Sequence, residues 1–126
     1  IEWTKKQHDY GLEYVKATQK SYPGLREEIA SIIDLDYEGP IFKVGKRLFQ
    51  SVKRKGDKQS KLYTIRNEEK ILIWDPVALD TSGKTATSRI AFTYDGEMLA
   101  VSAQNSGTEI TNIYIILTGI SKGPGL

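Results

Sequence analysis

The sequence has 126 residues, the size of one domain, and its hydrophobic fraction of 39% and mean hydropathy of −0.41 are typical of a globular rather than a disordered chain. It has no cysteine and a single histidine, His8, which excludes disulfides, thiol nucleophiles and multi-histidine metal sites. The longest apolar run, 113–117, is too short to cross a bilayer, and no basic-then-apolar leader opens the chain. We therefore expect a cytoplasmic chain, or a periplasmic one if a leader has been removed.

The N-terminal part of the chain has a helical pattern. Aromatic residues recur at helical spacing from Trp3 to Tyr14 with charged residues between them, which predicts a first helix over 1–20. A second helix is expected to begin at Pro23, because proline suits the first helical turn, where its missing N–H costs nothing. Its apolar face is formed by Leu25, Ile29, Ile32 and Ile33.

Short strand patterns replace the helical pattern after Gly39. The Asp95-Gly96 pair stands between two apolar runs, which predicts a tight β-hairpin. The last strand, 110–117, is apolar on both faces, as expected of a buried strand. Further strands are predicted at 47–53, 62–65 and 71–74, separated by polar turns.

Two helices followed by consecutive hairpins predict a mainly β fold with N-terminal helices. The strands form an antiparallel meander that fills under two four-stranded blades of an incomplete β-propeller. We predict three parts of the chain: a helical N-terminal segment at 1–38, a partial β-propeller at 39–118 and an irregular tail at 119–126.

No arrangement of catalytic residues is recognisable in the sequence. His8 stands on the polar side of the first helix, and no Gly-x-Ser-x-Gly turn offers a serine nucleophile. The glycines at 119, 123 and 125 belong to the tail and do not form a phosphate-binding loop between a strand and a helix. We predict no catalytic, cofactor-binding or metal-binding residue and no cofactor.

Two pairs of carboxylates are the remaining candidates for acid–base chemistry. Asp34 lies close to Asp36 near a helix end, and Asp75 and Asp80 flank a turn. Asp75 is better explained as a turn former before a proline, and Asp95 belongs to the predicted hairpin turn.

The basic residues are concentrated in one region, Lys43–Lys70. Such a cluster either attracts phosphates or keeps an exposed hairpin soluble by charging the edge of a sheet. Three acids, Asp57, Glu68 and Glu69, lie in the same region. The ten basic residues are Lys43, Lys46, Arg47, Lys53, Arg54, Lys55, Lys58, Lys61, Arg66 and Lys70.

Several motifs together give the sequence a recognisable order. Trp74–Asp80 contains an Asp-Pro-x-x-Leu turn, and Ser88–Ser102 contains a Phe-x-x-Asp-Gly-x-x-Leu-Ala hairpin. A polar loop, Asn105–Glu109, follows the hairpin. With Glu2-Trp3 near the start and the Gly39–Phe49 stretch, this ordered set resembles the prolyl oligopeptidase family of serine peptidases over 2–117. Glu109-Ile110 departs from the Asp-Trp pair of that family.

The resemblance implies a function for the whole protein rather than for this chain. In the family, the propeller restricts access to the active site and so selects short peptides, while the catalytic Ser, Asp and His lie in a later α/β-hydrolase domain. The chain is therefore expected to be a truncated N-terminal fragment that is inactive alone and is not an enzyme. The alternative is a stand-alone interaction module that uses the basic Lys43–Lys70 hairpin.

The expected partners follow from the same interpretation. The apolar helix face and the last strand, Tyr114–Leu117, would lack their usual neighbours, so we expect self-association as a homodimer or larger assembly. The missing remainder of the peptidase is a second expected partner. We expect no membrane contact and no specific binding of nucleic acid.

Overall fold

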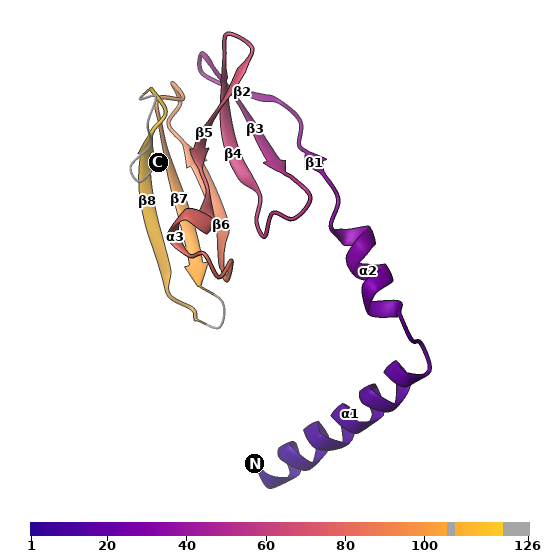
Figure 1. The fold of residues 1–126 in the computed structure, drawn as a ribbon. Coiled ribbons are helices and arrows are strands. Elements are labelled where there is room, and N and C mark those ends of the chain that lie inside the picture. The colour runs from indigo at the N-terminus through magenta and orange to yellow at the C-terminus, as the bar shows by residue number, and fades with distance from the viewer. Residues whose placement is uncertain (106–107, 120–126) are drawn as a thin grey trace. The chain divides into compact units, whose positions relative to one another are not determined.

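The chain forms two compact units, Ile1–Leu35 and Asp36–Leu126 (Figure 1). The computed structural model describes residues 1–105 and 108–119. Most of the tail predicted at 119–126 therefore lies outside the described residues. The boundaries predicted at residues 38 and 118 stay a prediction.

The first unit consists of two helices, α1 (Glu2–Lys20) and α2 (Leu25–Ile33). The prediction that the second helix begins at Pro23 is wrong, because Gly24 adopts a left-handed conformation with φ +85° and the helix starts after it. Neither helix, both of them fully described, has a buried residue. No helix among the described residues is both long and apolar enough to span a membrane.

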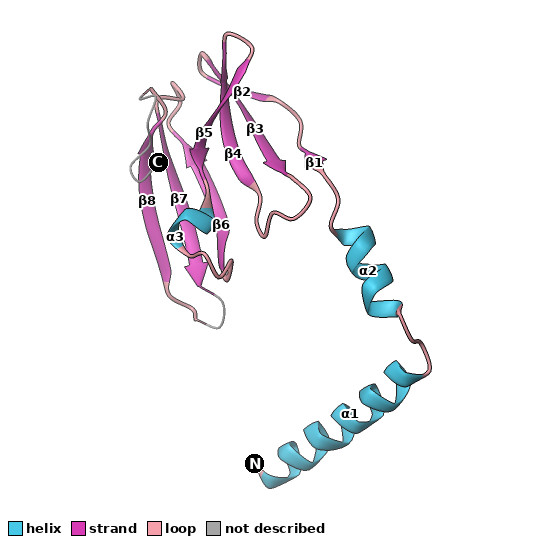
Figure 2. Ribbon diagram, viewed as in Figure 1, coloured by secondary structure: helices cyan, strands magenta, loops and turns pink. Residues whose placement is uncertain are grey.

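The second unit contains two antiparallel sheets (Figure 2). The first sheet has the strand order β1-β3-β4-β5, with β2 also paired to β3, and the second has the order β6-β7-β8. The short helix α3 (Pro76–Leu79) connects the two sheets. The strands are β1 (Tyr37–Glu38), β2 (Phe42–Val44), β3 (Arg47–Lys53), β4 (Lys61–Arg66), β5 (Glu69–Trp74), β6 (Thr85–Phe92), β7 (Met98–Asn105) and β8 (Thr111–Leu117).

This architecture confirms the predicted fold class: mainly β with N-terminal helices and antiparallel sheets. In the part of the chain that the structure describes, the sheets do not close into a ring, as expected of a partial propeller. The predicted strands at 47–53, 62–65 and 71–74 are present as β3, β4 and β5.

One hydrophobic core joins the two sheets. Phe49 of β3 and Phe92 of β6 have ring centroids 4.6 Å apart, and Trp74 of β5 and Tyr114 of β8 have ring centroids 5.4 Å apart. The Trp74 indole N–H also donates a hydrogen bond of 2.8 Å to the Thr87 hydroxyl. The two sheets are thus held face to face by packed aromatic rings, which favour such offset and tilted contacts. The buried core residues are Phe49, Leu62, Ile73, Trp74, Leu99, Val101, Ala103 and Ile116.

The last strand differs from the prediction that it is buried on both faces. Ile116 is buried, but the side chains of Ile113 and Ile115 on the opposite face are 69% and 62% exposed. That prediction is wrong for the described residues, because nothing among them covers Ile113 and Ile115 on this face.

Candidate functional site: the junction of the two sheets

Two tight turns bring the backbones of the two sheets into direct contact. Gly45 lies between β2 and β3 with φ +57°, and Gly96 lies between β6 and β7 with φ +75°. A Cβ atom on Gly45 would stand 2.1 Å from the Asp95 carbonyl oxygen, and one on Gly96 would stand 2.4 Å from the Val44 carbonyl oxygen. Both positions therefore require glycine, for conformation and for space.

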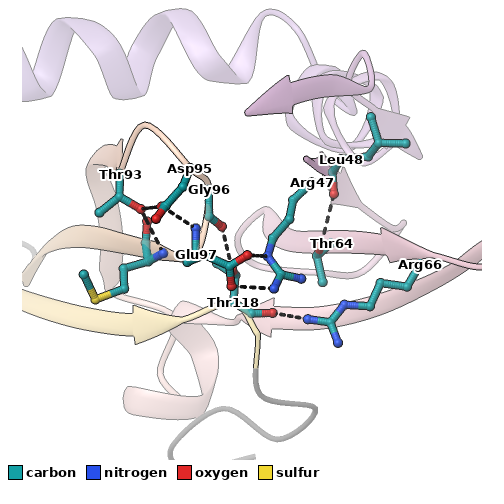
Figure 3. Close-up of polar contacts among 10 residues, drawn as sticks. Arg47, Leu48, Thr64, Arg66, Thr93, Asp95, Gly96, Glu97 and Thr118 are labelled. Carbon is teal, nitrogen blue, oxygen red and sulfur yellow. Dashed lines mark hydrogen bonds and ion pairs between the residues drawn. The ribbon is translucent and has the colours of Figure 1, made fainter. Parts of the chain in front are cut away.

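An ion pair crosses the junction beside these glycines (Figure 3). Arg47, at the start of β3, donates from Nη2 to Glu97 Oε2 at 2.5 Å and from Nε to Glu97 Oε1 at 3.2 Å. The side chain of Arg47 is 19% exposed and that of Glu97 is 51% exposed. Paired, parallel hydrogen bonds of this kind fix the relative orientation of the two groups as well as attracting them.

Asp95 orients Glu97 within the hairpin turn. Its Oδ1 accepts hydrogen bonds from the Thr93 hydroxyl at 2.6 Å and from the Glu97 backbone N–H at 3.0 Å. These two hydrogen bonds lower the pKa of Asp95 below its ordinary value, and the bond from Thr93 makes the larger contribution. These hydrogen bonds hold the turn in shape, and the antiparallel pairing of β6 with β7 on either side of it confirms the predicted Asp-Gly hairpin.

Thr118 connects the end of β8 to the same turn. This buried residue donates from its hydroxyl to the Gly96 carbonyl at 2.5 Å and from its backbone N–H to the Glu97 carbonyl at 2.9 Å. Its own carbonyl accepts a hydrogen bond from Arg66 at the end of β4, as Figure 3 shows. The junction thus ties β3, β4, the β6–β7 turn and β8 together.

The carboxylate pair Asp75 and Asp80 serves local structure. Asp75 Oδ1 accepts from the Val77 N–H at 2.9 Å and caps α3. Asp80 accepts from the Ser82 N–H at 2.9 Å and from the Thr85 N–H and hydroxyl at 3.1 Å each. Hydrogen bonds from Ser82 and then Thr85 lower the pKa of Asp80 to about 2, so it carries no proton to donate at neutral pH.

The other candidate residues, Asp34, Asp36 and His8, are described within their own units. Asp34 ends α2 in the helical unit, whereas Asp36 belongs to the second unit and accepts a 2.6 Å hydrogen bond from the Lys55 backbone N–H. His8 is exposed on α1. Among the described residues, no group of three or more potential metal ligands is present.

The basic region forms intramolecular ion pairs. Glu38 forms ion pairs with Lys70, at 2.9 Å, and with Arg54. Both contacts lower the pKa of Glu38, and the hydrogen bond from Lys70 makes the larger contribution. Lys61 lies 3.1 Å from a carboxylate oxygen of Asp57, whose hydrogen bond raises the pKa of Lys61. With the pair formed by Arg47, four of the ten cationic side chains are matched by carboxylates, which leaves less positive charge to attract phosphates.

An open hollow of about 640 Å³ lies beside β6 and β7. Its ionisable lining group is Lys84, accompanied by neutral polar side chains such as Gln59, Ser88 and Gln104. The lining offers hydrogen-bonding groups, and the Ser88 hydroxyl oxygen lies 2.8 Å from that of Ser102.

Residues 1–121 match the family model for the prolyl oligopeptidase N-terminal beta-propeller domain. The chain belongs to the prolyl oligopeptidase family. The match confirms the resemblance inferred from the ordered motifs, and it covers the helices as well as the sheets.

Solved structures of prolyl oligopeptidases have a similar fold. One chain, from a structural study of two prolyl endopeptidases, has a TM-score of 0.70 and 16% identity over 88% of this chain. Prolyl oligopeptidase B from Galerina marginata, bound to a 25mer macrocyclization substrate, has a TM-score of 0.71 and 20% identity over 94% of this chain. The matches span 17% and 18% of the lengths of those chains, so the sequence corresponds to under a fifth of each. A search of curated protein sequences found no match.

Sequence reasoning missed the ion pair at the junction of the two sheets. Arg47 and Glu97 are 50 residues apart, and neither stands out in composition or spacing. The available signal was that each charged residue follows a turn glycine within two positions, since Gly45 precedes Arg47 and Gly96 precedes Glu97. That pattern marks two hairpins, but it does not indicate that the hairpins meet.

Proposed function

We propose that this 126-residue chain acts as a non-catalytic part of the propeller of a prolyl oligopeptidase-type serine peptidase. In this role they help to restrict the access of peptides to a hydrolase domain and do not cleave peptides themselves. The observation that carries the proposal is the family match to the propeller domain over residues 1–121. We further place the protein in the cytoplasm, because a chain without cysteine suits a reducing compartment.

The chemistry of the described side chains supports this role. Asp75, Asp80 and Asp95 each accept hydrogen bonds that stabilise a turn or a helix end. Serine-dependent hydrolysis needs a nucleophile, an oriented base and donors for the oxyanion, and removing the nucleophile or the base abolishes most of the rate. Side chains that are already committed to local structure do not supply those groups.

The test is hydrolysis of a proline-containing chromogenic peptide by the purified 126-residue chain, with an active prolyl endopeptidase as the positive control. We expect no turnover above the rate without protein. Near-ultraviolet circular dichroism of buried Trp74 verifies that the chain is folded during the assay. Turnover that a serine-directed covalent inhibitor abolishes, with the inhibitor attached to this chain, would refute the proposal.

A further inference from the structure

The turn at the junction contains an aspartate followed directly by a glycine, a pair that rearranges to isoaspartate without any enzyme. The Gly96 nitrogen attacks the carboxyl carbon of the Asp95 side chain and forms an N–C bond. The carboxyl hydroxyl and the N–H proton leave as water, which gives a succinimide ring. A second water attacks the main-chain carbonyl carbon of the ring and breaks its bond to nitrogen. The main chain then runs through the former side chain of Asp95, with no net change in mass.

The folded turn holds the attacking nitrogen in place. The Gly96 N–H donates a hydrogen bond of 2.9 Å to the Thr93 carbonyl, and the Gly96 carbonyl accepts one of 2.5 Å from the Thr118 hydroxyl. Gly96 itself is buried. Ring closure requires the nitrogen to release its proton and to approach the carboxyl carbon in a suitable geometry, so both hydrogen bonds oppose the reaction.

Thr93 holds the carboxylate that the nitrogen would attack. Its hydroxyl lies 2.6 Å from Asp95 Oδ1 and 3.1 Å from the Met98 carbonyl oxygen, so its one proton goes to the closer, charged acceptor. This hydrogen bond makes the largest contribution to the lowered pKa of Asp95, which reduces the population of the neutral acid from which water leaves. Asp95 is exposed, so its protection comes from hydrogen bonds rather than from burial.

Isoaspartate at this position would separate the two sheets. The rearrangement inserts one methylene carbon into the main chain, about 1.5 Å of extra length. A Cβ atom on Gly45 would stand 2.8 Å from the Asp95 Cα atom, so the two turns have no room for a longer chain. We propose that Asp95-Gly96 is a latent isomerisation site, which is silent while the Thr93 hydroxyl holds the turn and becomes reactive when the junction opens. Local opening, ordinarily reversible, would then become permanent.

Thr93→Val tests the protection by exchanging the hydroxyl for a methyl group of similar size. Thr87→Val is the matched control, because it makes the same exchange and removes the hydrogen bond from Trp74 without touching the turn. Each folded chain is incubated at physiological temperature and neutral pH. Electron-transfer fragmentation of the tryptic peptide that begins at Ile90 then distinguishes isoaspartate from aspartate at position 95. We expect isoaspartate to form about tenfold faster in Thr93→Val than in the wild type or Thr87→Val, as for the loss of one hydrogen bond to a charged group.

Two further samples decide the question even if Thr93→Val fails to fold. Thr93→Ser retains the hydroxyl and should keep the wild-type rate, whereas the wild type unfolded in urea should form isoaspartate faster than any of the folded chains. Three results would overturn the proposal: equal rates in folded Thr93→Val and the folded wild type, an equal rise in Thr87→Val and Thr93→Val, and a folded wild type that reacts as fast as the unfolded chain. The second result would show that overall stability, and not the Thr93 hydroxyl, limits the reaction.

Discussion

Replacing Gly45 by alanine should destabilise the second unit far more than the same replacement at Gly56. Both glycines have positive φ, +57° and +86°, so alanine at either position costs about 1–2 kcal/mol of backbone strain. A Cβ atom at Gly56 meets nothing within 4 Å, whereas one at Gly45 would stand 2.1 Å from the Asp95 carbonyl oxygen. Relieving that overlap requires the two turns to separate, which adds about 1–3 kcal/mol, the usual cost of overpacking.

Urea unfolding followed by tryptophan fluorescence measures the difference, because Trp74 lies in the core between the sheets. We expect the unfolding midpoint of Gly45→Ala to fall two to three times as far as that of Gly56→Ala, with the slope of the transition unchanged. Equal losses for the two variants would show that the close contact between the turns does not exist in solution. Gly96→Ala should resemble Gly45→Ala, because its Cβ would stand 2.4 Å from the Val44 carbonyl oxygen.

Three further predictions concern charged groups. Glu97→Gln should lower the free energy of unfolding by about 1 kcal/mol in the same urea assay, because the half-exposed Glu97 carboxylate pairs with the largely buried Arg47. The control is Glu2→Gln, which removes a carboxylate from the exposed pair with Lys6 and should change the free energy of unfolding by under about 0.5 kcal/mol. The folded-state pKa of Asp80 is about 2, so the stability that the ionised carboxylate contributes is complete above its usual pKa near 4 and is lost as the pH falls toward 2. In Asp80→Asn, the unfolding midpoint should therefore decrease less between pH 4 and pH 2 than it does in the wild type. A steeper fall would contradict this reasoning. Lys53→Gln and Lys55→Gln should each change the free energy of unfolding by under about 0.5 kcal/mol. Single-stranded DNA should bind the wild-type chain weakly and lose its affinity as salt is added. Sequence-selective binding at physiological salt would favour the interaction-module alternative.

Local signals in the sequence predicted the elements of the fold well. The Asp95-Gly96 turn and the strands before and after it follow from hairpin chemistry and from alternation within a few residues. The short helix α3 was not predicted, because it spans only Pro76–Leu79 and a periodic pattern needs more turns to be visible. The position of Pro23 outside α2 was also missed, since Gly24 and not the proline sets the start of the helix.

Relationships between distant residues were not predictable from the pattern. The apolar pattern of β8 is compatible with burial on both faces, and only the exposed side chains of Ile113 and Ile115 in the structure show that its outer face is uncovered among the described residues. In the same way, the pairing of Arg47 with Glu97 depends on the meeting of two turns that the sequence describes separately. The absence of catalytic residues stays a prediction that the activity assay tests.

The most direct test of the central claim is the intact mass of the folded chain after treatment with a fluorophosphonate that labels activated serines. A propeller segment supplies no activated nucleophile, so we predict an unchanged mass under conditions in which an active prolyl endopeptidase is fully labelled. A stoichiometric adduct on a serine of this chain, lost on unfolding in urea, would contradict the assignment of these residues to the non-catalytic part of the peptidase.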